Sequence, residues 1–458
     1  MNSSLPRCLS SALTVVFLIA AGNCSTRSVI GLQTGQGGGP GTGGQANRGD
    51  GGSTGTGGIF NPSGDGGSPG RGGSCPASAG SSGSGLSFSA AVEYLTHSGS
   101  TLVALGDLNG DGRPDLAVAN DMSHSNTGGA GGADSGTAGP GTGGTPGASP
   151  GSVSVFLSST AGYGPPQYYN LNIAPISIVT GDLNGDGKAD VAIVNAQGVS
   201  VLLSDGSGAL LPPVSFATGT GPASVALGDL NGDGKADLAV ANQGSSNGSE
   251  LAGGDVAVLL NMGGGTFVAT NYPAGASPAA VTMADLNGDG KADLAIASGT
   301  GVSVLLNNGS GTFGPPASYG SGTNPFSIAA GDLNGDGKID LAVGSRAGGA
   351  SVLLNLGAGA FAAAVNYSYA APYNYSGPVV IGDLNGDGRP DLAGSIFRDA
   401  CSSVAVLLNQ GSGVFGAPSN VYPANPSSVT LGDLDGDGKL DLVVPNGDGV
   451  AVLLNTTP

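Results

Sequence analysis

The sequence contains 458 residues and carries a formal net charge of −19 at pH 7, with 90 glycines and no tryptophan. Such an acidic chain is repelled by a phosphate backbone, so the charge argues against nucleic acid as a partner. Beyond the first residues no segment is long and apolar enough to span a membrane, and no Cys/His spacing matches a zinc site.

The N-terminus has the pattern of a secretory signal. Residues 1–7 are basic and polar, and an apolar run ending in small residues follows at 13–21. We therefore predict a signal peptide at residues 1–22 and a protein that is exported in the bacterial manner, either secreted or held at the cell surface. Cys24 leaves a lipid anchor open, although the residues before it fit a lipobox poorly.

Residues 23–85 are dominated by glycine, serine, threonine and proline. This composition cannot bury enough apolar surface to offset the entropy of ordering, so the segment is predicted to be a disordered linker. Cys75 and Cys401 can form a disulfide in an oxidising compartment or remain free thiols, and the spacing does not decide between the two.

From residue 86 onward the sequence repeats short apolar runs of the β type. In the fourth unit these runs are 266–272, 279–286, 293–298 and 302–308, each rich in β-branched residues and bounded by glycine, proline or asparagine. No stretch sustains an apolar period of 3.6 residues. We therefore predict an all-β domain over residues 86–458 with four strands in each unit.

A nine-residue motif, DLNGDGRPD in its first copy and DLDGDGKLD in its last, joins two of these runs in each unit. We call the run before the motif the first strand, the run after it the second, the Val-Leu-Leu run the third and the aromatic run, such as 266–272, the fourth. It begins at seven aspartates: Asp107, Asp182, Asp229, Asp285, Asp332, Asp383 and Asp433. Successive copies start 75, 47, 56, 47, 51 and 50 residues apart, a period that suits propeller blades. The long first spacing contains a glycine-rich insertion at residues 121–152, which we predict to be disordered.

The motif has the donors that a hard cation requires. Positions 1, 3, 5 and 9 carry carboxylate or amide oxygens, position 7 would offer its backbone carbonyl with its basic side chain in solvent, and glycines at positions 4 and 6 permit a sharp turn. A turn alone would not need three aspartates in every copy. We expect up to seven structural Ca²⁺ ions. The predicted ligand residues are Asp107, Asn109, Asp111, Arg113 and Asp115; Asp182, Asn184, Asp186, Lys188 and Asp190; Asp229, Asn231, Asp233, Lys235 and Asp237; Asp285, Asn287, Asp289, Lys291 and Asp293; Asp332, Asn334, Asp336, Lys338 and Asp340; Asp383, Asn385, Asp387, Arg389 and Asp391; and Asp433, Asp435, Asp437, Lys439 and Asp441.

These loops are not EF-hands and they explain most of the net charge. Position 12, which holds the bidentate acid of an EF-hand, is Val, Ile or Gly in all copies. The loops contain 22 of the 32 acidic residues and seven of the 13 basic ones, a net charge of −15 that bound Ca²⁺ would offset.

The order of the strands indicates how the domain closes. The chain enters at residues 86–94 with a run of the fourth-strand type and leaves after 450–455, a run of the third-strand type. The entering strand can therefore complete the last of seven four-stranded blades, which removes the open sheet edge. We predict a closed seven-bladed β-propeller.

Residues 86–458 resemble the FG-GAP, or VCBS-type, repeat family, whose propeller also forms the head of integrin α subunits. The eponymous letters are kept at 415–418 as FGAP and at 313–316 as FGPP. The resemblance implies calcium loops on one face of a propeller, in proteins that adhere, recognise ligands or accompany extracellular enzymes. It does not imply integrin partners, since the leg domains of integrins are missing.

Strand alternation predicts which connections share a face. The connections between first and second strands, which are the calcium loops, and those between third and fourth strands lie on one face. The connections between second and third strands and between fourth and first strands vary more and lie on the opposite face. There we expect a protein or polysaccharide partner, bound by a monomer. Candidate contact residues on that face are Arg346, Tyr369, Tyr373, Tyr375, Arg398 and Asp399.

Three function classes fit these observations. A non-catalytic adhesion or recognition module is favoured, because only ten acidic residues lie outside the loops and no nucleophile motif is evident. An extracellular carbohydrate-active lyase or hydrolase and a purely structural surface protein remain the alternatives. No catalytic residue is predicted.

Overall fold

The computed structural model describes residues 85–121, 151–244, 254–299, 301–346, 348–369, 375–397, 402–422 and 426–458. Within these ranges the chain forms strands and turns and no helix, and hence no helix able to cross a membrane. The predicted signal peptide, the linker up to residue 84, residues 122–150 of the insertion predicted at 121–152, and the cysteines at 24, 75 and 401 lie outside the described residues. Ser152, at the end of that insertion, is the first residue of a strand.

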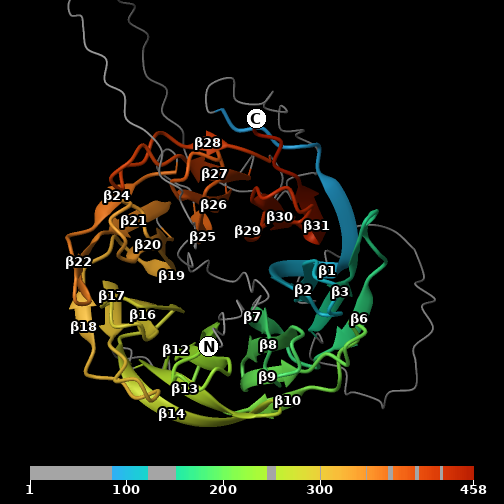
Figure 1. Ribbon diagram of the computed structural model, residues 1–458, viewed down its shortest axis with the longest axis horizontal. Helices are drawn as coiled ribbons and strands as arrows, with labels where there is room; N and C mark the ends of the chain where they lie inside the picture. The colour runs from blue at the N-terminus through green and yellow to red at the C-terminus, as the bar shows by residue number, and fades with distance from the viewer. Residues whose placement is uncertain are drawn as a thin grey trace, which may run out of the picture. The chain divides into compact units, whose positions relative to one another are not determined.

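Seven blades of antiparallel strands form a ring (Figure 1). We number each blade by the Asp loop that it contains, from Asp107 in blade one to Asp433 in blade seven. Blades two to four consist of β7 (Pro175–Gly181), β8 (Asp190–Asn195), β9 (Gly198–Leu202) and β10 (Val214–Phe216); β11 (Pro222–Gly228), β12 (Asp237–Asn242), β13 (Gly254–Gly263) and β14 (Thr266–Gly275); and β15 (Ala280–Ala284), β16 (Asp293–Ser298), β17 (Gly301–Leu305) and β18 (Ala317–Tyr319).

Blades five and six repeat this plan. Blade five has a two-stranded ribbon, β22 (Asn355–Gly357) with β23 (Ala360–Phe361), before its outermost strand. The four-stranded sheets are β19 (Pro325–Gly331), β20 (Asp340–Ser345), β21 (Gly349–Leu353) and β24 (Val365–Tyr367); and β25 (Tyr375–Gly382), β26 (Asp391–Phe397), β27 (Ser403–Leu407) and β28 (Ser419–Asn420).

Blades seven and one share β1 (Val92–Gly106). Val92–Leu95 pair with β31, and the second half of β1 pairs with β2, so one long strand is both the outermost strand of blade seven and the innermost strand of blade one. The other elements of this sheet are β29 (Thr430–Gly432), β30 (Asp441–Pro445), β31 (Gly447–Leu453), β2 (Asp115–Asn120), β3 (Ser152–Phe156) and β6 (Gln167–Asn170), with the ribbon β4 (Ser158–Ser159) and β5 (Gly162–Tyr163) beside it.

These blades confirm the predicted seven-bladed, all-β propeller. The entering strand was expected at 86–94, and in the structure the regular pairing starts at Val92, preceded by a bridge from Phe88 to Asn455. The innermost strands contact one another around the ring in the order β1, β7, β11, β15, β19, β25, β29 and back to β1.

The core lies between the blades. Seven clusters of buried apolar side chains are formed, one at each junction of neighbouring blades. At four junctions a Phe of one blade meets an aromatic ring of the preceding outermost strand edge to face, as Phe313 meets Tyr272 with ring centroids 5.3 Å apart. These Phe residues include the two that begin the FG motifs, so the motif stabilises contacts between blades.

Candidate metal centres

The predicted ligand residues at positions 1 to 7 lie in a short loop that connects the innermost strand of a blade to the next strand, and the position 9 aspartate is the first residue of that next strand. The glycines at positions 4 and 6 all have φ between 74° and 87°, a region that other residues rarely adopt. Their N–H groups donate to the position 1 carboxylate; in blade two, Gly185 and Gly187 lie 2.6 and 2.8 Å from the oxygens of Asp182. The chain therefore wraps around the first aspartate, as a cation loop requires.

The position 9 aspartate is wholly buried in all seven loops. Each of its oxygens accepts one backbone N–H. In blade four, Asp293 accepts from Leu286 at 3.0 Å and from Asn307 at 2.7 Å. Two such bonds leave further lone pairs on the carboxylate for a cation.

Burial disfavours the charged form of these carboxylates. It is the main cause that raises the pKa of Asp190, Asp293, Asp340, Asp391 and Asp441 to about 6, and the aspartates within each loop raise it further. The position 9 aspartates of blades one and three shift in the same direction. A buried carboxylate surrounded by other acids needs a positive partner.

The basic residue at position 7 is not that partner. Lys235, Lys291 and Lys338 place Nζ 2.7 to 3.1 Å from the position 5 carboxylate of their own loop. These three lysine side chains are 42–43% exposed, so they lie at the surface as the sequence predicts, and their ion pairs contribute little to stability. A divalent cation bound in the loop would supply a positive partner for the position 9 carboxylate.

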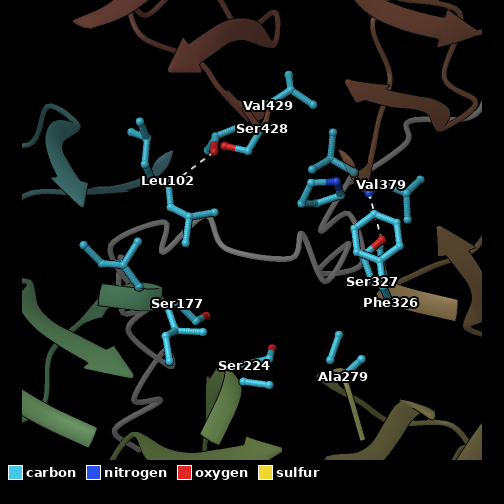
Figure 2. A pocket seen from close by; sticks show the side chains of 18 of the residues that line it. Leu102, Ser177, Ser224, Ala279, Phe326, Ser327, Val379, Ser428 and Val429 are labelled. Carbon is cyan, nitrogen blue, oxygen red and sulfur yellow. Dashed lines mark hydrogen bonds between the residues drawn. The ribbon is translucent and has the colours of Figure 1, made fainter. Parts of the chain in front are cut away.

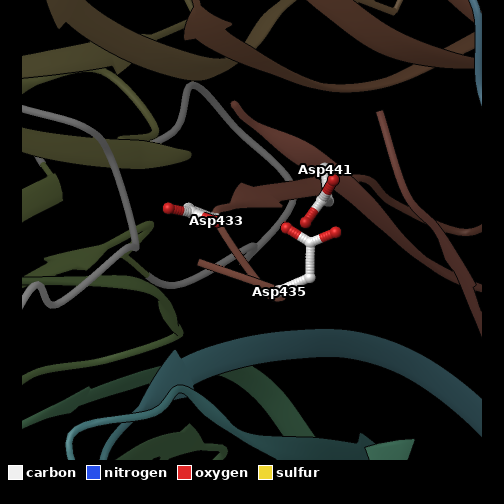
Figure 3. A group of neighbouring side chains, drawn as sticks. All are labelled: Asp433, Asp435 and Asp441. Carbon is white, nitrogen blue, oxygen red and sulfur yellow. The ribbon is translucent and has the colours of Figure 1, made fainter. Parts of the chain in front are cut away.

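The last loop shows the donor set most directly. In Asp433, Asp435 and Asp441 one carboxylate oxygen each lies within 4.8 Å of the others. Figure 3 shows the carboxylates of Asp435 and Asp441 facing each other. Oxygen donors of this number and charge fit Ca²⁺, which accepts six to eight oxygens, so the residues present suit the ion that the sequence predicts.

The loops also hold neighbouring blades together, which sequence reasoning missed. Asn307, at the end of the VLLN run of blade four, donates from Nδ2 to the Leu230 carbonyl in the loop of blade three at 2.7 Å and to Ala292 in its own loop at 2.8 Å. Blades three to seven share this arrangement, and Ser204 of blade two donates to Leu108 of blade one. The equivalent asparagines are Asn261, Asn355, Asn409 and Asn455.

The signal for these cross-links was present in the sequence as an asparagine after the Val-Leu-Leu run of blades three to seven. The hydrogen-bond partner of this asparagine could not be found from the sequence, because it lies about 70 to 80 residues earlier in another blade. The same contacts place the turns after the third strands beside the metal loops, as strand alternation predicts.

The opposite face contains the remaining connections. Arg346 follows β20 and donates its backbone N–H to Asn324 in the connection that precedes β19. Tyr369, predicted as a contact residue, is only 1% exposed and packs into the core between blades five and six, so that prediction was wrong. Tyr373, Arg398, Asp399 and the side chain of Tyr375 lie outside the described residues.

Family models of FG-GAP-like repeats match residues 182–240, 245–296, 285–343, 332–394 and 396–444, which together span more than half of the chain. An FG-GAP repeat model matches residues 99–138. No curated protein matches the chain.

Solved structures show similar folds at low identity. An Agrocybe aegerita lectin that recognises terminal N-acetylglucosamine is 20% identical, with a TM-score of 0.46 over 77% of this chain and 87% of the lectin. A rhamnogalacturonan lyase of Bacillus licheniformis is 15% identical, with a TM-score of 0.48 over 78% of this chain and 72% of the lyase. BBS1N, solved in complex with ARL6DN, is 12% identical, with a TM-score of 0.49 over 82% of this chain and 97% of BBS1N.

Proposed function

The chain belongs to the FG-GAP repeat family, and on that premise we propose that it is an exported, calcium-stabilised β-propeller that recognises a protein or polysaccharide without catalysing a reaction. The observation that carries the proposal is the set of seven buried position 9 carboxylates, none of which has a basic side chain as its hydrogen-bond partner among the described residues. Calcium would neutralise these carboxylates and hold each loop in its wrapped form.

In each loop the carboxylates of positions 1, 5 and 9, the side-chain oxygen of position 3 and the carbonyl of position 7 would hold the ion. In the loops of blades two to six the position 2 carbonyl accepts a side-chain amide N–H from the next blade, so an ordered loop also supports the junction between blades. Calcium binding would thereby stabilise the whole ring rather than single turns. If free calcium is about ten times Kd, each site adds roughly 1.4 kcal/mol to the free energy of unfolding.

The recognition surface would be the face opposite these loops. Its connections differ in length and sequence from blade to blade, as is usual for binding loops on a regular scaffold. The calcium loops would then brace the scaffold while the opposite connections select the partner.

Two measurements test the proposal on residues 23–458. The melting temperature should fall substantially on chelation with EGTA and recover on addition of Ca²⁺; an unchanged melt would exclude a structural role for calcium. Glycan-array and pull-down screens with and without EGTA should identify a partner that binds only the calcium-loaded form. Reproducible turnover of a polysaccharide would instead make the protein an enzyme, and the absence of any partner would favour a purely structural role.

A further inference from the structure

A cavity of about 330 Å³ opens at the centre of the ring, where the innermost strands of the blades meet. Figure 2 shows side chains from several blades around it, among them Leu102, Ser177, Ser224, Ala279 and Val429. Most lining residues come from the innermost strands, and Gln243 and Arg346 directly follow second strands, so the cavity opens toward the face opposite the candidate metal loops. Its volume lies at the lower end of the range of small-molecule sites, roughly 300 to 1,000 Å³.

The walls are mainly apolar but include serine hydroxyls at the same position of three innermost strands. Ser177, Ser224 and Ser327 occupy equivalent positions in β7, β11 and β19, and each accepts a backbone N–H from the following blade at 3.1 to 3.4 Å. Accepting that bond leaves each hydroxyl hydrogen free to donate. The cavity therefore offers hydrogen-bond donors in an apolar surround.

Arg346 supplies the only charge among the lining residues, which include no aspartate or glutamate. It is exposed, and its guanidinium carbon lies 5.0 Å above the ring centroid of Phe326. Within the described ranges it is the only arginine or lysine outside position 7 of the loops, and no described carboxylate pairs with it. In a chain of net charge −19, this acid-free cavity is a local site of positive charge.

We propose that the cavity binds a small carboxylic acid with an apolar body. The carboxylate would pair with the Arg346 guanidinium, which presents several N–H donors in a plane that matches a carboxylate. The apolar body would lie against the side chains of the innermost strands, such as Leu102, Ala279 and Val429, and the serine hydroxyls would donate to the remaining carboxylate lone pairs. Such binding is separate from the recognition proposed above, since it needs neither a protein nor a polysaccharide.

Octanoate is a suitable probe, with octanol and octylamine as neutral and cationic controls of similar length. Calorimetric titration of calcium-loaded residues 23–458 should show saturable binding of octanoate and much weaker binding of the other two. Arg346→Gln should weaken octanoate binding by about tenfold or more, because a charge-assisted bond is lost. Arg71→Gln, which removes one positive charge from the predicted linker, should leave octanoate binding unchanged.

A second variant locates the site independently of charge. Ala279→Phe should fill part of the cavity and abolish octanoate binding while the calcium-dependent melt is retained. The proposal would be overturned if octanoate binding survived Ala279→Phe, if octanol bound as strongly as octanoate, or if Arg346→Gln and Arg71→Gln had the same effect. A lack of saturable octanoate binding would overturn it as well. Each of these results leaves the calcium-dependent melt as a separate test of the proposed function.

Discussion

Asn261 Nδ2 donates a 2.8 Å hydrogen bond to the carbonyl of Leu183, which lies in the loop of the preceding blade. The same nitrogen donates to Ala236 in its own loop, so one amide joins two candidate metal loops. Leu183 is itself fully buried. A loop held in place by a cation would therefore order the next junction as well as its own turn.

Removal of one such amide should destabilise the ring. Asn307→Ala removes the bonds of 2.7 and 2.8 Å to the carbonyls of Leu230 and Ala292, although Leu230 still accepts the Gly311 N–H at 3.0 Å. A net contribution of about 0.5–1.5 kcal/mol for each hydrogen bond predicts that the free energy of unfolding falls by about 1–3 kcal/mol. Urea denaturation in saturating calcium measures the change.

The neighbouring Asn308 provides the control for this variant. Its side chain is exposed, so Asn308→Ala should change the free energy of unfolding by no more than about 0.5 kcal/mol. Equal effects of the two substitutions would contradict a bridging role for Asn307.

Blade one offers the reverse experiment. Its equivalent residue is Ser158, whose buried hydroxyl makes no hydrogen bond in the described structure and so does not reach Leu434 in the loop of blade seven. Ser158→Asn supplies the longer amide that the other blades use, and should raise the free energy of unfolding by about 1 kcal/mol. Ser159→Asn, at an exposed neighbouring position, should have no such effect. A neutral or destabilising Ser158→Asn would show that this junction does not gain from the amide bond that the other blades use.

Calcium binding can be tested without disturbing the buried carboxylates. Asp289 at position 5 of blade four is exposed at about a third of its side chain and pairs with Lys291 at 3.1 Å. Asp289→Asn should change stability in EGTA by less than about 1 kcal/mol, because surface ion pairs contribute little. In calcium it should reduce the stabilisation by roughly one site's share, about 1.4 kcal/mol at tenfold excess over Kd.

The matched control is Asp205→Asn, which removes an exposed aspartate outside the loops. It should leave the difference between calcium and EGTA unchanged. If Asp289→Asn also leaves that difference unchanged, blade four does not bind calcium.

The metal-free protein should become more stable as the pH falls from neutral. Burial raises the folded-state pKa of five position 9 aspartates, among them Asp293 and Asp441, to about 6, whereas an unfolded aspartate titrates near 3.9. Between about pH 4 and 6 the folded state therefore binds more protons than the unfolded state. This contribution to stability is fully present below the unfolded pKa and is lost as the pH rises through about 6.

With calcium bound, the protein should instead be more stable at neutral pH than at the lower pH, because protons compete with the cation for the same carboxylates. Denaturation at about pH 5 and pH 7, with and without calcium, measures both trends. If the metal-free protein were less stable at pH 5 than at pH 7, burial would not destabilise the charged form of these aspartates, and the prediction would be wrong.

Much of the propeller could be predicted from the sequence because its information is local and repeated. The strands of blade four, expected at 279–286, 293–298 and 302–308, are observed at Ala280–Ala284, Asp293–Ser298 and Gly301–Leu305. The glycines at positions 4 and 6 of each loop require positive φ for a reason that lies within nine residues. Burial was harder to foresee: Tyr369 reads as a surface tyrosine, yet the packing of blades five and six encloses it.

The sequence by itself determined the number of blades, the closing strand and the residues that can surround a cation, since each depends on spacing along the chain. Only the tertiary structure decided that the position 9 carboxylates are wholly buried, that Asn261 reaches the loop of another blade, and that Arg346 stands at a cavity without acids. These relationships join residues from different strands and blades, and such contacts are set by how the blades pack around the ring rather than by their order in the chain.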